Sequence, residues 1–122
     1  MKKTFSILLG TALAGIVSTP QAANIGSKAP QLQIEHWVKG KPVDLAKADD
    51  KKIHIIEFWA TWCGPCRDSI PHLTKLQEKY KGKGVTVIGI TDEPKATVER
   101  FVRRQKKQME YTVAIEKGDT MS

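Results

Sequence analysis

The chain has 122 residues, of which 40% are hydrophobic and 27% are charged. This length allows one domain at most, and the ordinary composition excludes a wholly disordered protein and a fibrous repeat. Twenty Lys and Arg against 13 Asp and Glu give a net charge of +7, or +5 without Lys2 and Lys3; this excess is modest, and with no recognisable motif we expect no nucleic-acid partner.

Residues 1–23 have a different pattern from the rest of the chain. A positively charged start precedes a mostly apolar run, and small residues follow it. This order is typical of a secretory signal peptide, which we expect to be cleaved after Ala22 or Ala23, with an uncleaved membrane anchor as the alternative. We therefore expect an exported, periplasmic protein with one domain over residues 24–122.

The rest of the chain alternates between strand-like and helix-like patterns. Short apolar runs rich in β-branched residues predict strands, and apolar residues at helical spacing predict amphipathic helices. In chain order we expect an edge strand over 32–35, a strand over 53–59, a helix over 63–81, a strand over 85–90, a helix that opens at Pro94, and a strand over 111–115. This alternation predicts an α/β fold with a mainly parallel sheet flanked by helices.

Two of these segments carry a further expectation. The run Ile53–Trp59 is almost continuously apolar, which is typical of a strand covered on both faces. The helix after Pro94 places basic residues on the face opposite Val98, Phe101 and Val102. We interpret that face as a solvated surface, with weak association with an acidic surface as the alternative. Its basic residues, with those that follow, are Lys95, Arg100, Arg103, Arg104, Lys106 and Lys107.

Cys63 and Cys66 are the only cysteines. Outside the cytosol they can form a persistent disulfide, but a bridge across so short a loop removes little entropy from the unfolded chain. The spacing therefore indicates reactivity rather than structural stabilisation.

The two cysteines lie where a predicted strand ends and a predicted helix begins. The first helical turn presents unpaired N–H groups and positive dipole charge, which favour a thiolate at Cys63, and Cys66 is close enough to resolve a mixed disulfide. Pro65 is tolerated in this turn because it needs no N–H there, and Gly64 allows a partner protein to approach.

Glu57 interrupts the apolar strand between Ile56 and Phe58. Burial there should raise the pKa of its carboxyl, which would suit it to accept the proton of Cys66 as that residue attacks the mixed disulfide. The alternative is an edge position in which Glu57 faces water.

The stretch Trp59–Cys66 resembles the active-site stretch of the thioredoxin superfamily, and Pro71 also fits. Ala29-Pro30, residues 40–45 and the strand over 87–90 look most like the TlpA-like and ResA-like exported reductases. The resemblance covers residues 29–119. It implies a thioredoxin-like fold, with a buried carboxylate at Glu57 and with Trp62 beside the attacking sulfur.

The same resemblance implies a function and partners. The expected activity is that of a thiol-disulfide oxidoreductase that reduces disulfides of exported proteins, with a place in cytochrome c maturation and a membrane thiol-disulfide electron donor. The redox centre would be the Cys63–Cys66 disulfide itself, with no other cofactor. Catalysis would rest on Cys63, Cys66 and Glu57, and substrate contact on Trp62, Gly64 and Pro65.

One departure from the superfamily pattern concerns the end of the chain. Superfamily members continue past the strand that matches Tyr111–Ile115 into a helix, a cis-proline loop, a hairpin and a last helix, whereas no proline follows Pro94 here. We therefore expect the chain to correspond to the N-terminal portion of the fold, with its C-terminal part missing and an edge strand exposed.

Three other functions compete with this interpretation. A non-catalytic interaction module or inactive fragment would suit a shortened fold. A zinc or copper site would need further ligands from His36, His54 or His72, none of which has a paired spacing, so we expect no metal. Peroxide reduction also begins from an activated cysteine at a helix start, but the local motif argues against it.

Overall fold

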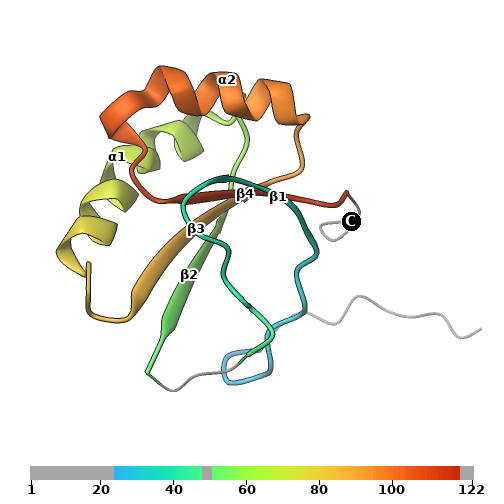
Figure 1. Ribbon diagram of the computed structural model, residues 1–122, viewed down its shortest axis with the longest axis vertical. Coiled ribbons are helices and arrows are strands. Elements are labelled where there is room, and N and C mark those ends of the chain that lie inside the picture. The colour runs from blue at the N-terminus through green and yellow to red at the C-terminus, as the bar shows by residue number, and fades with distance from the viewer. Residues whose placement is uncertain (1–23, 48–50, 119–122) are drawn as a thin grey trace, which may run out of the picture.

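The computed structural model describes residues 24–47 and 51–118, so the expected signal peptide over 1–23 lies outside the described residues. Figure 1 shows the arrangement of the elements, and none of the helices in the described part is long and apolar enough to cross a bilayer. In chain order the elements are β1 (Ile34–Lys39), β2 (Ile53–Phe58), α1 (Gly64–Lys79), β3 (Val85–Thr91), α2 (Lys95–Gln105), the 3-10 turn η1 (Lys106–Gln108) and β4 (Thr112–Glu116).

The strands form a four-stranded sheet in the order β1-β4-β3-β2. β2, β3 and β4 run parallel, and β1 pairs antiparallel with β4 at one edge. The registers place Gly89 between Glu57 and Val113. The predicted α/β fold with a mainly parallel sheet and an N-terminal edge strand is therefore confirmed.

Both helices cover the same face of the sheet (Figure 1). Because strand side chains alternate between faces, the odd-numbered positions of β2, β3 and β4 point toward the helices. The core on this side contains Trp59, Ile70, Val87, Val98, Met109, Tyr111, Val113 and Ile115.

The opposite face is covered by the N-terminal segment rather than by a helix (Figure 1). Ile88, Ile90 and Ala114 are fully buried there. Partly buried side chains that pack against them come from the N-terminal segment, β1 and β2: Leu32, Ile34, Trp37, Val43, Leu45 and Ile56.

The expectation that the strand over Ile53–Trp59 would be covered on both faces is wrong for its two ends. Within the described residues β2 has a strand neighbour on one side only, β3. Ile53 is 59% exposed and Phe58 is 44% exposed, whereas Trp59, just beyond the strand, is 3% exposed. An apolar run indicates that most of its side chains are at least partly removed from water. It does not distinguish a central strand from an edge strand.

The helix predicted over 63–81 is α1, which is shorter by one residue at its start and two at its end. Its apolar stripe, Ile70, Leu73 and Leu76, packs against the helix-side core. Gly82 and Gly84 follow with φ angles of +75° and +77°, a conformation that favours glycine and ends the helix.

Gln77 on α1 completes the hydrogen bonding of β3 where β4 has not yet begun. β4 starts at Thr112, opposite Ile88, which leaves the first residues of β3 without a strand neighbour on that side. The Gln77 amide donates to Val85 O at 3.0 Å, and its carbonyl accepts from the Val87 N–H at 2.8 Å. One side chain thus satisfies two backbone groups that would otherwise be unpaired.

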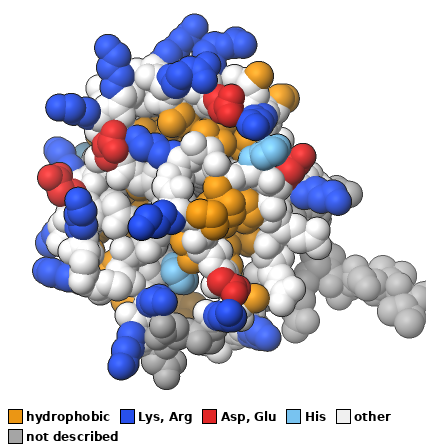
Figure 2. Space-filling model, in the orientation of Figure 1, with side chains coloured by type: hydrophobic (Ala, Val, Ile, Leu, Met, Phe, Trp, Pro, Cys, Tyr) orange, Lys and Arg blue, Asp and Glu red, His pale blue; other side chains and the backbone are white. Residues whose placement is uncertain are grey.

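α2 has the predicted amphipathic arrangement. Val98 is fully buried, and Phe101 and Val102 pack against the helix-side core. The exposed side carries Arg100, Arg103 and Arg104. In Figure 2 blue side chains gather over the upper part of the molecule, where Figure 1 places α2.

The close packing over Gly89 yields a stability prediction. A Cβ at this position would lie 3.1 Å from Trp59 Nε1 and 3.1 Å from Tyr111 Cε2, and both rings are buried. We expect Gly89→Ala to lower the free energy of unfolding by about 1–3 kcal/mol because the rings must shift. Urea unfolding measures this change.

Gly118→Ala is the matched control, since a Cβ at Gly118 meets nothing within 4 Å. Both substitutions lower the entropy of the unfolded chain equally, so their difference isolates the packing effect. Equal midpoints for the two variants would contradict the prediction.

Candidate active site

The connection from β2 to α1 sets the position of both sulfurs. The Trp59 N–H donates to Ile90 O at 3.0 Å, which extends the pairing with β3 one residue past the strand. The Cys63 N–H then donates to Ala60 O at 3.1 Å and closes a tight turn. Trp59 and Ala60 are buried, so this turn is anchored in the core while the residues after it reach the surface.

Cys63 and Cys66 form a disulfide at the start of α1, with their Cα atoms 5.3 Å apart. Cys63 is the N-cap, in an extended conformation, and its Sγ accepts a hydrogen bond from the Cys66 N–H at 3.3 Å. The sulfur thus takes the place of the oxygen that usually caps a helix. Cys63 is partly exposed, and Cys66 packs against the helix-side core.

The three residues expected to contact substrate all lie at the surface around Cys63. Trp62 precedes it and is 81% exposed. Gly64 and Pro65 are exposed in the first turn of α1, and a Cβ at Gly64 would meet nothing within 4 Å. A protein chain can therefore reach the disulfide from the solvent side.

Glu93 holds the same connection from the other side of the site. Its Oε2 accepts from the Thr61 N–H at 2.7 Å and its Oε1 accepts from the Thr61 hydroxyl at 2.6 Å. Glu93 follows β3, whose carboxyl end lies at the same edge of the sheet as that of β2. A single carboxylate thus joins the loops after two parallel strands.

The Glu57 carboxyl lies on the helix-covered face of β2 and is half-buried rather than open to water, although β2 is an edge strand. Ser69 Oγ lies within hydrogen-bond distance of Glu57 Oε1, at 2.6 Å. Glu57 Oε2 is buried, with no hydrogen-bond partner among the described residues. Burial raises the pKa of Glu57 above its ordinary value of 4.5, and a hydrogen bond that Ser69 donates to the ionised carboxylate opposes that rise.

The pKa of Tyr111 also depends on the charge of Glu57. Burial raises the pKa of Tyr111, and the negative charge of Glu57 raises it further. The Tyr111 hydroxyl is also buried without a hydrogen-bond partner in the described part of the chain. Tyr111 is therefore neutral at physiological pH and adds no charge beside Glu57.

The structure brings together residues that were predicted separately, and it adds others. Cys63, Cys66 and Glu57 lie at the same end of the sheet, with Trp62, Gly64 and Pro65 around the sulfurs. Sequence reasoning missed Ser69, Thr61 and Glu93. Helical spacing places Ser69 on the face of Cys66, and Glu93 follows a parallel strand, so both positions carried a signal.

The three histidines lie on different elements. His36 is on β1, His54 on β2 and His72 on α1. Within the residues that the structure describes, no group of three or more His, Cys, Asp or Glu side chains could hold a metal ion.

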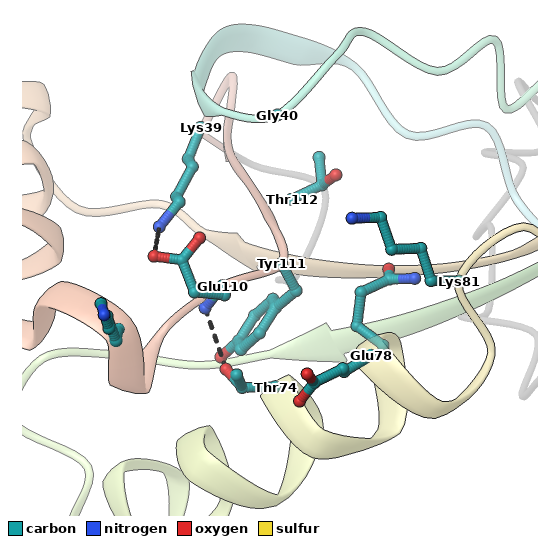
Figure 3. A pocket seen from close by; sticks show the side chains of 10 residues that line it. Lys39, Gly40, Thr74, Glu78, Lys81, Glu110, Tyr111 and Thr112 are labelled. Carbon is teal, nitrogen blue, oxygen red and sulfur yellow. Dashed lines mark hydrogen bonds and ion pairs between the residues drawn. The ribbon is translucent and has the colours of Figure 1, made fainter.

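A cavity of about 790 Å³ lies away from the disulfide, toward the other end of α1 (Figure 3). Lys39 crosses one side of it, with its Nζ 3.0 Å from Glu110 Oε1. Glu78 and Lys81, near the end of α1, line another side. Positive and negative side chains alternate around this cavity, so its charge does not select one kind of ligand.

The chain is similar to known proteins whose names agree with a redox-active cysteine pair. A profile of the AhpC/TSA family matches residues 25–122. The thiol-disulfide oxidoreductase ResA of Bacillus cereus is 33% identical over 109 residues, which cover 88% of this chain and 61% of that protein. The chain thus spans about three fifths of the length of the curated relatives that it matches.

Solved structures also resemble the chain. One is the solution structure of a thiol-disulfide oxidoreductase candidate from Bacteroides vulgatus, with 34% identity and a TM-score of 0.51, covering 74% of this chain and 59% of that one. Another is a thiol-disulfide isomerase from Corynebacterium glutamicum, with a TM-score of 0.62, covering 75% of this chain and 62% of that one. At 16% identity the second likeness concerns the fold alone.

The contact between Glu93 and Thr61 generates a prediction for stability. We expect Glu93→Ala to lower the free energy of unfolding by about 1–3 kcal/mol, because the Thr61 N–H and hydroxyl lose a charged acceptor. Glu99→Ala is the control, since among the described residues Glu99 meets Lys95 alone, at 3.9 Å on the surface, and the substitution should change stability by less than about 0.5 kcal/mol. Equal urea midpoints for the two variants would refute the contact's importance.

The half-buried Glu57 generates a prediction for pH dependence. Because its pKa is raised in the folded protein, folding is penalised as pH rises above the ordinary value of 4.5. Glu57→Gln cannot ionise, so its stability advantage over the unchanged protein should grow from pH 4 toward pH 8. Urea unfolding of the oxidised proteins at several pH values measures this, with Glu78→Gln, at an exposed position, as the control. An advantage that is independent of pH would contradict burial as the cause.

Proposed function

The chain belongs to the AhpC/TSA family, and on that premise we propose that it is a thiol-disulfide oxidoreductase that reduces disulfides of exported proteins. The observation that carries the proposal is the Cys63–Cys66 disulfide at the start of α1, with the Cys63 sulfur as helix cap. The ResA relatives, named thiol-disulfide oxidoreductases, support the same activity.

Cys63 is the attacking residue of the proposed reaction. In the dithiol form its sulfur would keep the Cys66 N–H as a donor and would lie at the positive end of the helix dipole. Both effects stabilise a thiolate, which is the nucleophile in thiol-disulfide exchange. The partial exposure of Cys63 lets a substrate reach it.

The proposed reaction transfers two electrons to the substrate. The Cys63 thiolate attacks one sulfur of the substrate disulfide, so that a mixed disulfide forms and the first substrate thiolate leaves. The Cys66 thiol then loses its proton and attacks Cys63 Sγ. The mixed disulfide breaks, the second substrate thiolate leaves, and Cys63 and Cys66 end as a disulfide.

Glu57 is the proposed acceptor of the Cys66 proton. Ser69 bridges its carboxyl to the backbone carbonyl of Cys66, which sets this carboxyl next to the first turn of α1. Burial raises the pKa of Glu57, and a base with a raised pKa takes up a proton more readily near neutral pH. The Cys66 proton would therefore pass to Glu57 as the disulfide forms.

The partners of this reaction follow from the exposed surface around the sulfurs. Trp62 offers a large apolar contact beside Cys63, and Gly64 and Pro65 leave open space for a substrate backbone. We propose no cofactor other than the disulfide itself. To turn over as a reductase the protein needs an electron donor, for which we propose a membrane thiol-disulfide protein, and a place in cytochrome c maturation is one setting for it.

The proposed location is the periplasm. It rests on the pattern of residues 1–23, which is that of a signal peptide with cleavage near Ala22 or Ala23. The basic face of α2 suits a weak electrostatic association with an acidic surface.

Equilibration of the full chain in thiol-disulfide buffers tests the activity. We expect one reversible two-electron transition of Cys63 and Cys66, scored by the mass shift after alkylation. A midpoint as reducing as the glutathione poise, or more so, would support a reductase, and a strongly oxidising midpoint would make the protein a disulfide donor instead. Without a reversible transition the proposed function fails, and an interaction module or inactive fragment remains.

Two single substitutions test the assigned roles of the sulfurs. We expect Cys66→Ser to accumulate a mixed disulfide with a model disulfide protein, because the resolving thiol is lost. Cys63→Ser should accumulate none above background, because the exposed attacking sulfur is lost. Non-reducing gels followed by mass spectrometry read the result, and the reverse pattern would exchange the two roles.

A further inference from the structure

Ser69 contacts two oxygen atoms at once. Its Oγ lies 2.6 Å from Glu57 Oε1 and 2.7 Å from the backbone carbonyl oxygen of Cys66. Ser69 comes one helical turn after Cys66 on α1, and a hydroxyl at this spacing commonly donates to the preceding turn. The unusual feature is the second, equally short contact to a carboxyl.

The number of protons limits how these contacts can be made. A serine hydroxyl carries one proton and can accept through its lone pairs. If Glu57 is ionised, the carboxylate oxygen and the Cys66 carbonyl oxygen beside Ser69 Oγ are both acceptors. The single hydroxyl proton can then serve only one of these two contacts, and the other contact brings two oxygen atoms together with no proton between them. If Glu57 is protonated, its O–H donates to Ser69 Oγ and the Ser69 hydroxyl donates to Cys66 O. Both short contacts are then hydrogen bonds.

The surroundings of Glu57 also favour the protonated carboxyl. Its Oε2 and the Tyr111 hydroxyl are buried without hydrogen-bond partners in the described part of the chain. The groups that face it are Ser69 and Cys66 from α1, Gly89 across the sheet, and Tyr111 from the chain before β4. Among the described residues no lysine or arginine contributes to the pKa of Glu57, so no positive charge there compensates an ionised form.

We propose that Ser69 is a positioning residue that switches its hydroxyl between two acceptors according to the charge of Glu57. In the disulfide state it accepts the Glu57 proton and donates to the Cys66 carbonyl. When Glu57 ionises, the Ser69 hydroxyl turns to donate to the carboxylate, and the Cys66 carbonyl loses that hydrogen bond. The switch couples the carboxyl to the backbone of the resolving cysteine.

Within turnover, this inference rests on the proposed function. The proton that leaves the Cys66 thiol would arrive at a carboxylate that Ser69 already contacts, and it would remain on Glu57 once the disulfide has formed. No other oxidant or reductant enters, because the electrons pass between the cysteines and the substrate disulfide as described. The coupling itself is a property of the oxidised protein and can be measured without a substrate.

Carbon-13 NMR of the oxidised full chain tests the proton's position. The side-chain carboxyl signal of Glu57, assigned by its loss in Glu57→Gln, is titrated with pH in the unchanged protein, in Ser69→Ala and in Ser69→Thr. We expect Ser69→Ala to lower the titration midpoint, because the protonated carboxyl loses its acceptor. Ser69→Thr, which keeps a hydroxyl, should restore it. A midpoint that rises in Ser69→Ala would overturn the proposal, because Ser69 would then act only as a donor to the carboxylate, and so would an unchanged midpoint.

A second measurement needs no substitution and does not depend on how a variant folds. The backbone carbonyl carbon of Cys66 should shift with pH at the same midpoint as the Glu57 carboxyl, because the Ser69 hydroxyl leaves it when Glu57 ionises. A Cys66 carbonyl signal that does not follow Glu57 would overturn the switch.

A turnover measurement links the switch to the proposed function. It also distinguishes failure of the switch from failure of the proposed function. With a model disulfide protein, Ser69→Ala should resolve the mixed disulfide about three- to tenfold more slowly than the unchanged protein, the effect of one hydrogen bond, and Ser69→Thr should recover most of the rate. A coupled titration without redox activity would uphold the switch and reject the proposed function. Redox activity with uncoupled titrations would do the opposite.

Discussion

The chain must turn from the end of β2 into α1 within the residues between Phe58 and Gly64, and both sulfurs take their positions from this turn. Its first part is fixed in the core, because Trp59 is buried and continues the pairing with β3. Its second part is fixed by Glu93, which accepts two hydrogen bonds from Thr61. Cys63 therefore lies at the surface as the N-cap of α1. Rigid supports on both sides of the turn allow an exposed sulfur to keep a defined geometry.

The same arrangement separates a reactive surface from a buried carboxyl. Cys63 and Trp62 reach solvent at the start of α1, whereas Glu57 lies under the helix on the adjoining strand. The burial of Glu57 disfavours its charge, and the Ser69 hydroxyl and the neutral Tyr111 lie close to it. Gly89, opposite Glu57, leaves room for the rings of Trp59 and Tyr111 to close this space. A carboxyl with a raised pKa in such surroundings can exchange a proton with its neighbours.

The two faces of the sheet are built differently, and this difference agrees with the proposed chemistry. The helix-covered face holds the larger core and the polar contacts of the site, through Ser69, Gln77 and Glu57. The other face is covered by the N-terminal segment and holds a smaller core around Ile88 and Ile90. The basic residues of α2 point away from both cores, so charge for an acidic partner lies on the surface and does not disturb Glu57.

The sequence by itself determined the order of the elements, the mainly parallel sheet and the pair Cys63 and Cys66, because these depend on local periodicity and on spacing within one helical turn. It also favoured burial of Glu57, since an unpaired carboxylate in an apolar strand is costly, and the structure places that side chain half-buried. The tertiary structure alone decided that β2 is an edge strand in the described chain, that Ser69 joins Glu57 to Cys66, and that Glu93 holds Thr61. Apart from the contact of Ser69 with Cys66 within α1, these contacts join residues that are distant in the sequence. Their distances depend on how helices and loops pack on the sheet, which local patterns suggest but do not fix.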